Sequence, residues 1–192
     1  TSAETSGDSS SANDIEPSIE VPTEQLSDTE PVRGGVLRFG VNAESDGLNP
    51  TSSALSAPGL TMAMAVFDTL AAFDANGNAV PFLAESFTPS TDYQSWTVKL
   101  REGIRFHDGT PLNADAAIIN ATLIREDPLV GLTLKPFVDP ENHLVKVDDL
   151  TFTVNLLEPN AFWPATMAEQ IGIIASLAWL EAAVDNPELN QK

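Results

Sequence analysis

Two segments of the chain alternate apolar and polar side chains with a period of two, and this pattern constrains the fold more than any other feature. Residues 95–106 (SWTVKLREGIRF) and 143–156 (HLVKVDDLTFTVNL) place their apolar side chains on one face of an extended backbone. The second segment has an Asp-Asp turn at its middle, and residues 73–80 (FDANGNAV) have an Asn-Gly turn between apolar flanks. Such turns join neighbouring strands. The sequence therefore predicts a sheet that contains antiparallel hairpins.

Helical periodicity interrupts these strand patterns. Residues 161–170 predict one helix, and Ser176 suits the N-cap of another. A Gly pair followed by alternation at residues 34–42 (GGVLRFGVN) predicts a further strand. Residues 59–70 place five apolar side chains on one helical face, namely Met62, Ala63, Val66, Phe67 and Leu70. Because strands and helices are interspersed, we predict a mixed α/β fold with helices flanking the sheet.

Residues 105–120 (RFHDGTPLNADAAIIN) hold His107, one of two histidines in the chain, directly before Asp108. Adjacent side chains of an extended strand point to opposite faces, so this pair does not by itself form a catalytic site. The other histidine, His143, has no matching metal-binding motif nearby. Asp108-Gly109 suits a tight turn and Asn113 suits a helix N-cap. We therefore interpret the stretch as a strand–turn–helix joint.

The helix that follows this joint has its own predicted core face. Apolar or partly apolar side chains recur there at helical spacing, and we expect them to pack inward: Ile118, Ile119, Thr122 and Leu123.

Charge and composition exclude several classes of function. Asp and Glu number 28 against 9 Lys and Arg, which gives a formal net charge of -19. A chain so acidic repels phosphate backbones and anionic lipid surfaces, so we expect no nucleic-acid partner. The absence of cysteine excludes disulfides, thiol catalysis and zinc-thiolate sites. The longest apolar run, residues 171–180, is too short to span a bilayer.

Residues 1–32 differ in composition from the rest of the chain. They contain no Lys or Arg and are rich in Asp, Glu and Ser. Such a segment buries too little apolar surface to offset its ordering entropy, so we predict a disordered acidic linker.

The segment LAESFTPSTDYQSWTVKLREGIRFHDGTPLNADA (83–116) resembles the family 5 extracellular solute-binding proteins, the receptors of peptide, nickel and related ABC importers. Further matches stand around it in order: GGVLRFG, DGLNP, VFDTL, VDDLTFTVNLLEP and IIASLAWLEAAVDNP. One departure is Asn49, where the family usually has Asp. The resemblance covers residues 34–192 and implies a periplasmic-binding-protein-like fold of type II.

The resemblance also implies a domain organisation. After the linker at residues 1–32, residues 33–50 correspond to the first strand of the ligand-binding lobe. Residues 51–150 correspond to an inserted accessory domain, and residues 151–192 return to the first lobe. Family members continue into a second lobe, so we expect an amino-terminal fragment from which that lobe is absent.

The function implied by the resemblance is the capture of a peptide or similar small solute by closure of two lobes, and its delivery to the transmembrane subunits of an ABC permease. In peptide-binding members, the chain just after the Leu-Asp-Pro element lines the cleft. The matching residues closest to a ligand would be Ala54, Leu55 and Ser56. The resemblance implies no cofactor, no metal site and no catalytic residue. It places the protein outside the cytoplasm, touching the membrane only through a lipid anchor upstream of Thr1.

Two alternatives remain open from the sequence. A cell-surface hydrolase would use His107 or His143 as its base and a serine such as Ser86 as its nucleophile, although no nucleophile-elbow sequence is present. A non-catalytic structural or adhesive surface domain on a stalk is the second.

Overall fold

The computed structural model describes residues 34–45 and 47–185, with the side chains of the last two residues left aside. The chain divides into two units, residues 1–39 and 40–192. The predicted linker at residues 1–32 lies outside the described residues. The strand predicted at residues 34–42 does not form: residues 34–41 have no strand partner among the described residues, and Leu37 is 88% exposed. A strand needs a neighbour for its backbone hydrogen bonds, which explains the difference.

A four-stranded sheet organises residues 40–185. Its strands are β3 (Ala84–Pro89), β4 (Ser95–Leu100), β5 (Leu144–Lys146) and β6 (Thr151–Asn155), in the order β3-β4-β6-β5 with every pair antiparallel. The predicted alternation is confirmed, because Trp96, Val98 and Leu100 are buried while Lys99 is exposed. Val98 lies opposite Phe152 in the register of β4 and β6.

A separate hairpin joins β1 (Ala71–Phe73) to β2 (Ala79–Pro81). The carboxylate of Asp74 accepts the N–H groups of Asn76 and Asn78, each at 2.8 Å. Gly77 has a φ of 80°, a conformation that suits glycine. The predicted Asn-Gly turn is therefore confirmed.

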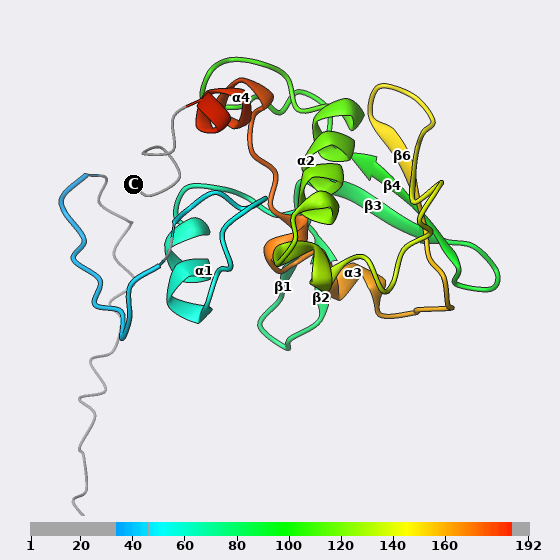
Figure 1. The fold of residues 1–192 in the computed structure, drawn as a ribbon, viewed down its shortest axis with the longest axis horizontal. Coiled ribbons are helices and arrows are strands. Elements are labelled where there is room, and N and C mark those ends of the chain that lie inside the picture. Colours follow the sequence, from blue (N-terminus) through cyan, green and yellow to red (C-terminus); the bar gives the residue numbers. More distant parts are fainter. Residues whose placement is uncertain (1–33, 46, 186–192) are drawn as a thin grey trace, which may run out of the picture. The chain divides into compact units, whose positions relative to one another are not determined.

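Helix α2 (Ala114–Glu126) packs across the sheet (Figure 1). The predicted cap is confirmed, because the Asn113 side chain accepts the N–H of Ala116 at 2.9 Å. The predicted core stripe is confirmed only in part: Ile118 packs against the core, whereas Ile119 is 40% exposed. The buried face instead runs through Ala114, Ala116, Ala117, Asn120 and Ile124. The prediction counted only apolar side chains, so it did not include the buried polar residue Asn120 in this face.

Helix α1 (Ala57–Ala63) is shorter than the helix predicted at residues 59–70. The chain leaves the helix because Thr69 forms a β-bridge with Ile173 and the N–H of Leu70 donates to the carbonyl of Gly172 at 2.8 Å. Both contacts need extended backbone. Helical periodicity alone cannot predict this distant partner.

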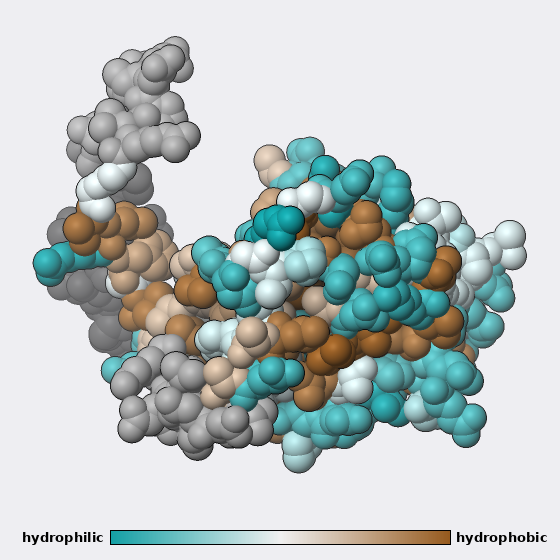
Figure 2. Space-filling view, turned by 90° about the horizontal axis from the view of Figure 1, so that it is seen from above, coloured by the Kyte–Doolittle hydropathy of each residue, from teal (hydrophilic) through white to brown (hydrophobic). Residues whose placement is uncertain are grey.

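The remaining elements are short. They are η1 (Val130–Thr133), α3 (Trp163–Thr166), η2 (Gln170–Gly172) and α4 (Leu177–Asp185). The predicted N-cap of α4 is confirmed, because the Ser176 hydroxyl accepts the N–H of Trp179 at 3.1 Å. Among the described residues, no helix has the length and apolar character needed to cross a bilayer. Apolar side chains also reach the surface, and Figure 2 shows them as brown areas between hydrophilic ones.

Candidate ligand-binding site

Residues 104–113 form the predicted strand–turn–helix joint. Arg105 and Pro111 form a β-bridge, and the N–H of Phe106 donates to the carbonyl of Thr110 at 2.9 Å. Gly109 closes the turn with a φ of 85°. The strand before the joint ends at Leu100, so Phe106 belongs to the turn and not to β4.

The carboxylate of Asp108 is occupied by this turn. It accepts the N–H of Thr110 at 2.8 Å and the Thr110 hydroxyl at 2.6 Å. These hydrogen bonds, from the Thr110 hydroxyl first and its N–H second, lower the pKa of Asp108, and the nearby hydroxyl of Ser176 lowers it further. The chemistry of Asp108 is that of a structural acceptor.

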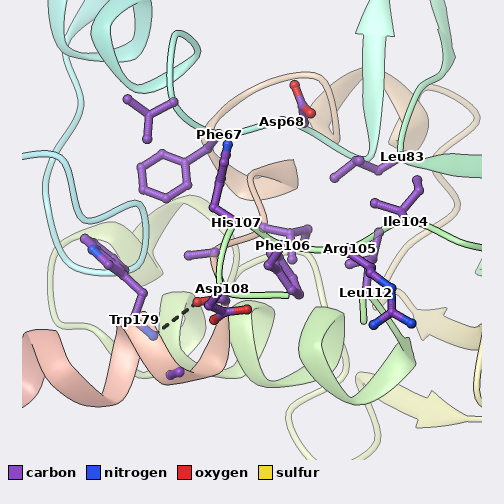
Figure 3. Close-up of a pocket in the computed structure, with 15 residues that line it drawn as sticks. Phe67, Asp68, Leu83, Ile104, Arg105, Phe106, His107, Asp108, Leu112 and Trp179 are labelled. Atoms are coloured by element: carbon purple, nitrogen blue, oxygen red, sulfur yellow. Dashed lines mark hydrogen bonds between the residues drawn. The ribbon is translucent and has the colours of Figure 1, made fainter. Parts of the chain in front are cut away.

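A cleft of about 430 Å³ lies between the joint and α4. In Figure 3, Phe67, His107 and Trp179 lie together on one side, and Leu83, Ile104 and Arg105 lie on the other. The rings of Phe67 and Trp179 meet edge to face, with centroids 5.5 Å apart. His107 is therefore part of an aromatic wall.

The three residues of the hydrolase alternative do not meet. His107 lines the cleft, whereas His143 lines a small cavity in the core with Leu134 and Val138. Ser86 lies in β3 opposite Lys99 and lines neither space. Nor do the described parts of the chain contain a group of three or more His, Cys, Asp or Glu side chains placed to hold a metal ion.

His143 is half-buried at the edge of the core. Burial lowers its pKa, and the nearby positive charge of Arg125 lowers it further, against the opposing effect of Asp139. Its Nε2 atom is buried and has no hydrogen-bond partner within residues 34–45 and 47–185. The neutral imidazole is thus favoured there.

Residues 49–53 form a compact, mostly buried turn. The side-chain oxygen of Asn49 accepts the N–H and the hydroxyl of Thr51, both at 2.9 Å. The carbonyl of Asn49 accepts the N–H of Ser52 at 3.3 Å and that of Ser53 at 2.9 Å. Asn49 therefore organises the start of the segment that the family resemblance predicts to lie next to a ligand.

Gln170 of η2 holds the same segment from the other side. Its Nε2 group donates to the carbonyls of Pro50 at 2.9 Å and Ser53 at 2.7 Å. Its Oε1 atom accepts the N–H of Leu55 at 3.3 Å. No sequence motif marks Gln170, which lies 115 residues beyond Leu55 along the chain, so sequence patterns could not select it.

We call the three hydrogen bonds of the Gln170 side chain to Pro50, Ser53 and Leu55 the clamp. The three predicted ligand-contacting residues follow the turn at residues 49–53. Ala54 and Ser56 are exposed, and Leu55 is half-buried. The carbonyl of Ser56 accepts the N–H of Leu60 at 2.7 Å and so begins α1. The structure brings the three residues together at the surface, and their contact with a ligand stays a prediction.

Comparison with known proteins identifies the class to which this fold belongs. The structure of the periplasmic binding protein AgaA from A. tumefacien R10, in complex with agropinic acid, aligns with 75% of this chain and 29% of its own at 27% identity, with a TM-score of 0.63. OppA of Burkholderia pseudomallei aligns with 77% of this chain and 32% of its own at 23% identity, with a TM-score of 0.66. The predicted fold class, a periplasmic-binding-protein-like mixed α/β fold, is confirmed.

Residues 78–192 match the bacterial extracellular solute-binding proteins, family 5 Middle. Because this match covers more than half of the sequence, the chain belongs to that family. Its members are binding proteins, not enzymes.

Individual relatives match over a limited length. A probable peptide ABC transporter periplasmic-binding protein of Sinorhizobium fredii is 32% identical over 108 residues, which cover 56% of this chain and 20% of the relative. The nickel-binding periplasmic protein of Escherichia coli is 35% identical over 100 residues, covering 52% and 18%. The glutathione-binding protein GsiB of Pectobacterium atrosepticum is 30% identical over 122 residues, covering 62% and 23%. The chain thus spans about a fifth of the length of these relatives.

Proposed function

We propose that the chain is part of the substrate-binding component of an ABC importer, which captures a peptide or similar small solute and delivers it to a membrane permease. Its membership of family 5 carries this proposal. Relatives named for peptide, nickel and glutathione binding support a small solute as ligand. Because two of these relatives are named as periplasmic proteins, we place the protein outside the cytoplasm. A lipid anchor upstream of Thr1 belongs to the same proposal.

The clamped segment at residues 49–56 is the wall of the ligand cleft in this proposal, with Ala54, Leu55 and Ser56 nearest the ligand. In this proposal residues 33–50 belong to the ligand-binding lobe, residues 51–150 form the accessory domain, and residues 151–192 return to the lobe. The pairing of β6 with both β4 and β5 favours an accessory domain that extends a few residues further, to the end of β6. A second lobe closes over the ligand, and the ligand stabilises the closed form.

Calorimetry tests the proposal with three probes: trialanine, reduced glutathione and nickel chloride. Each is titrated into residues 1–192 and into the longest polypeptide translated from the reading frame that contains them. We expect saturable binding of one probe by the longer product and much weaker binding by residues 1–192, because one lobe supplies only part of the contact surface.

Two outcomes would contradict the proposal. Equally tight binding by residues 1–192 would exclude capture between two lobes. Failure of the longer product to bind any probe, together with unchanged uptake of labelled trialanine when the gene is deleted, would exclude the peptide-type receptor.

A further inference from the structure

We infer that Gln170 is a positioning residue for the main chain of the ligand. It holds residues 50–55 so that the backbone groups of Ala54 and Ser56, and not the N–H of Leu55, are turned toward the ligand. This inference rests on the function proposed above and deepens it by assigning the register in which an extended ligand would pair.

The carboxamide of Gln170 is fully used by this segment. Its two N–H donors reach the carbonyls of Pro50 and Ser53, and its oxygen accepts the N–H of Leu55. The opposite orientation of the amide would bring its oxygen against two carbonyl oxygens and its NH₂ group against an N–H. The three contacts therefore fix both the rotamer of Gln170 and the path of the segment.

Backbone contacts of the residues next to Gln170 hold Gln170 in place. The carbonyl of Gly172, at the end of η2, accepts the N–H of Leu70 at 2.8 Å, and Thr69 forms a β-bridge with Ile173. A side chain at Gly172 would collide with the carbonyl of Met167. That carbonyl accepts the N–H of Ala71 at 3.0 Å. The segment is thus tied through Gln170 to β1.

The hydrogen bond from Leu55 decides which backbone donors remain. The N–H of Leu55 is occupied by Gln170. Ser56 is extended, with a φ of -68° and a ψ of 172°. The N–H groups of Ala54 and Ser56 are therefore the donors left for a ligand. Neither has a hydrogen-bond partner within residues 34–45 and 47–185, and both residues are exposed.

This arrangement suits an extended peptide as ligand. Two donors two residues apart, on either side of the occupied Leu55 N–H, suit the carbonyl groups of an extended peptide, and the carbonyl of Ala54 offers a further acceptor. The methyl group of Ala54 and the hydroxymethyl group of Ser56 are small. Recognition here would therefore depend on the main chain of the peptide, with little preference for its side chains.

Amide hydrogen exchange on the 192-residue chain tests the clamp directly. The variant Gln170→Met keeps the length of the side chain and removes its hydrogen bonds, and Gln94→Met at an exposed position is the matched control. We expect the Leu55 N–H to be protected and those of Ala54 and Ser56 to exchange freely. Gln170→Met should speed exchange at Leu55 by about tenfold, the loss of one hydrogen bond, while Gln94→Met leaves it unchanged.

Exchange at Leu55 that does not respond to Gln170→Met would overturn the inference. So would protection of Ala54 and Ser56 in the unliganded chain, because their N–H groups would then be occupied.

A second measurement separates positioning from a general structural role. The longest polypeptide of the reading frame is titrated with trialanine and with trialanine methylated at its central nitrogen, which removes one main-chain donor. We expect the parent protein to prefer trialanine by about tenfold, Gln94→Met to keep this ratio, and Gln170→Met to bring it close to one. Loss of stability alone would weaken both ligands equally and leave the ratio unchanged.

The two measurements fail in different ways. If the parent protein binds neither peptide, pairing of this segment with the main chain of a peptide is wrong, and hydrogen exchange at Leu55 still decides whether Gln170 holds the segment. If trialanine binds and the ratio survives in Gln170→Met, the function stands and the positioning role of Gln170 is wrong.

Discussion

The joint at residues 104–113 and the segment at residues 49–56 differ in how their polar groups are satisfied. The joint carries the more conspicuous sequence, with His107, Asp108 and Gly109 in a row. Its carboxylate is nonetheless used by Thr110, two residues away. The segment at 49–56 consists mostly of small residues, yet its carbonyl and N–H groups are held by Gln170 from a distant part of the chain.

This difference shows where a binding function can reside. A turn that satisfies its own polar side chains has little hydrogen-bonding capacity left for a ligand. A segment held by its backbone from behind can present its remaining backbone groups forward. The segment that contains Ala54 and Ser56 therefore has backbone groups available for a ligand, and their contact with one stays a prediction.

The largest effect on stability is expected from substitution of Asn120, a buried residue of the helix that follows the joint. Its side chain donates to the carbonyls of Ala116 and Ala175 at 2.9 and 2.8 Å and accepts the N–H of Ala175 at 3.0 Å. Asn120→Leu leaves the N–H and carbonyl of Ala175 buried without this partner. We expect the free energy of unfolding in urea to fall by about 2–4 kcal/mol.

Asn142→Leu is the control for this prediction, because Asn142 is exposed and its side chain forms no hydrogen bond within the described residues. A loss at Asn120 no larger than that at Asn142 would show that the joint does not depend on the buried amide.

A smaller and local effect on stability is expected from substitution of Asn49, which lies in the segment at residues 49–56. Asn49→Ala removes the acceptor of the Thr51 N–H and hydroxyl, and we expect a loss of about 1 kcal/mol with faster amide exchange at Thr51. Asn49→Asp keeps the acceptor and should preserve protection at Thr51. Equal exchange in both variants would mean that the turn forms without this side chain.

The smallest effect is expected from His107→Ala. The imidazole is exposed on the aromatic wall of the cleft, so we expect the free energy of unfolding to change by less than about 0.5 kcal/mol. Turnover of p-nitrophenyl acetate, measured before and after the substitution, provides the second readout. An esterase activity that is present in the parent chain and lost in His107→Ala would support the hydrolase alternative. The functional site would then lie at the joint and not at residues 49–56.

Local signals predicted much of this fold. The alternation at residues 95–100, the turn at Gly77 and the caps at Asn113 and Ser176 depend on neighbours within a few residues, and each forms as expected. Where the prediction failed, a distant partner decided the outcome. Helix α1 ends early because the chain pairs with Gly172 and Ile173.

The candidate site shows the same limit more clearly. The resemblance to the family selected Ala54, Leu55 and Ser56, and the structure places them at the surface. Gln170 could not be selected, because a single glutamine carries no local pattern and its partners lie 115 to 120 residues away. Asn120 was missed for a related reason, since a polar residue does not count toward an apolar stripe although its amide is buried at 0% exposure.

The clamp formed by Gln170 contacts only backbone atoms of Pro50, Ser53 and Leu55. Side chains along residues 54–56 can accordingly be exchanged without removing any of its contacts. An engineer could vary those three positions to retune selectivity while the path of the chain stays constant. The same protein scaffold would then serve as a starting point for sensors of different solutes.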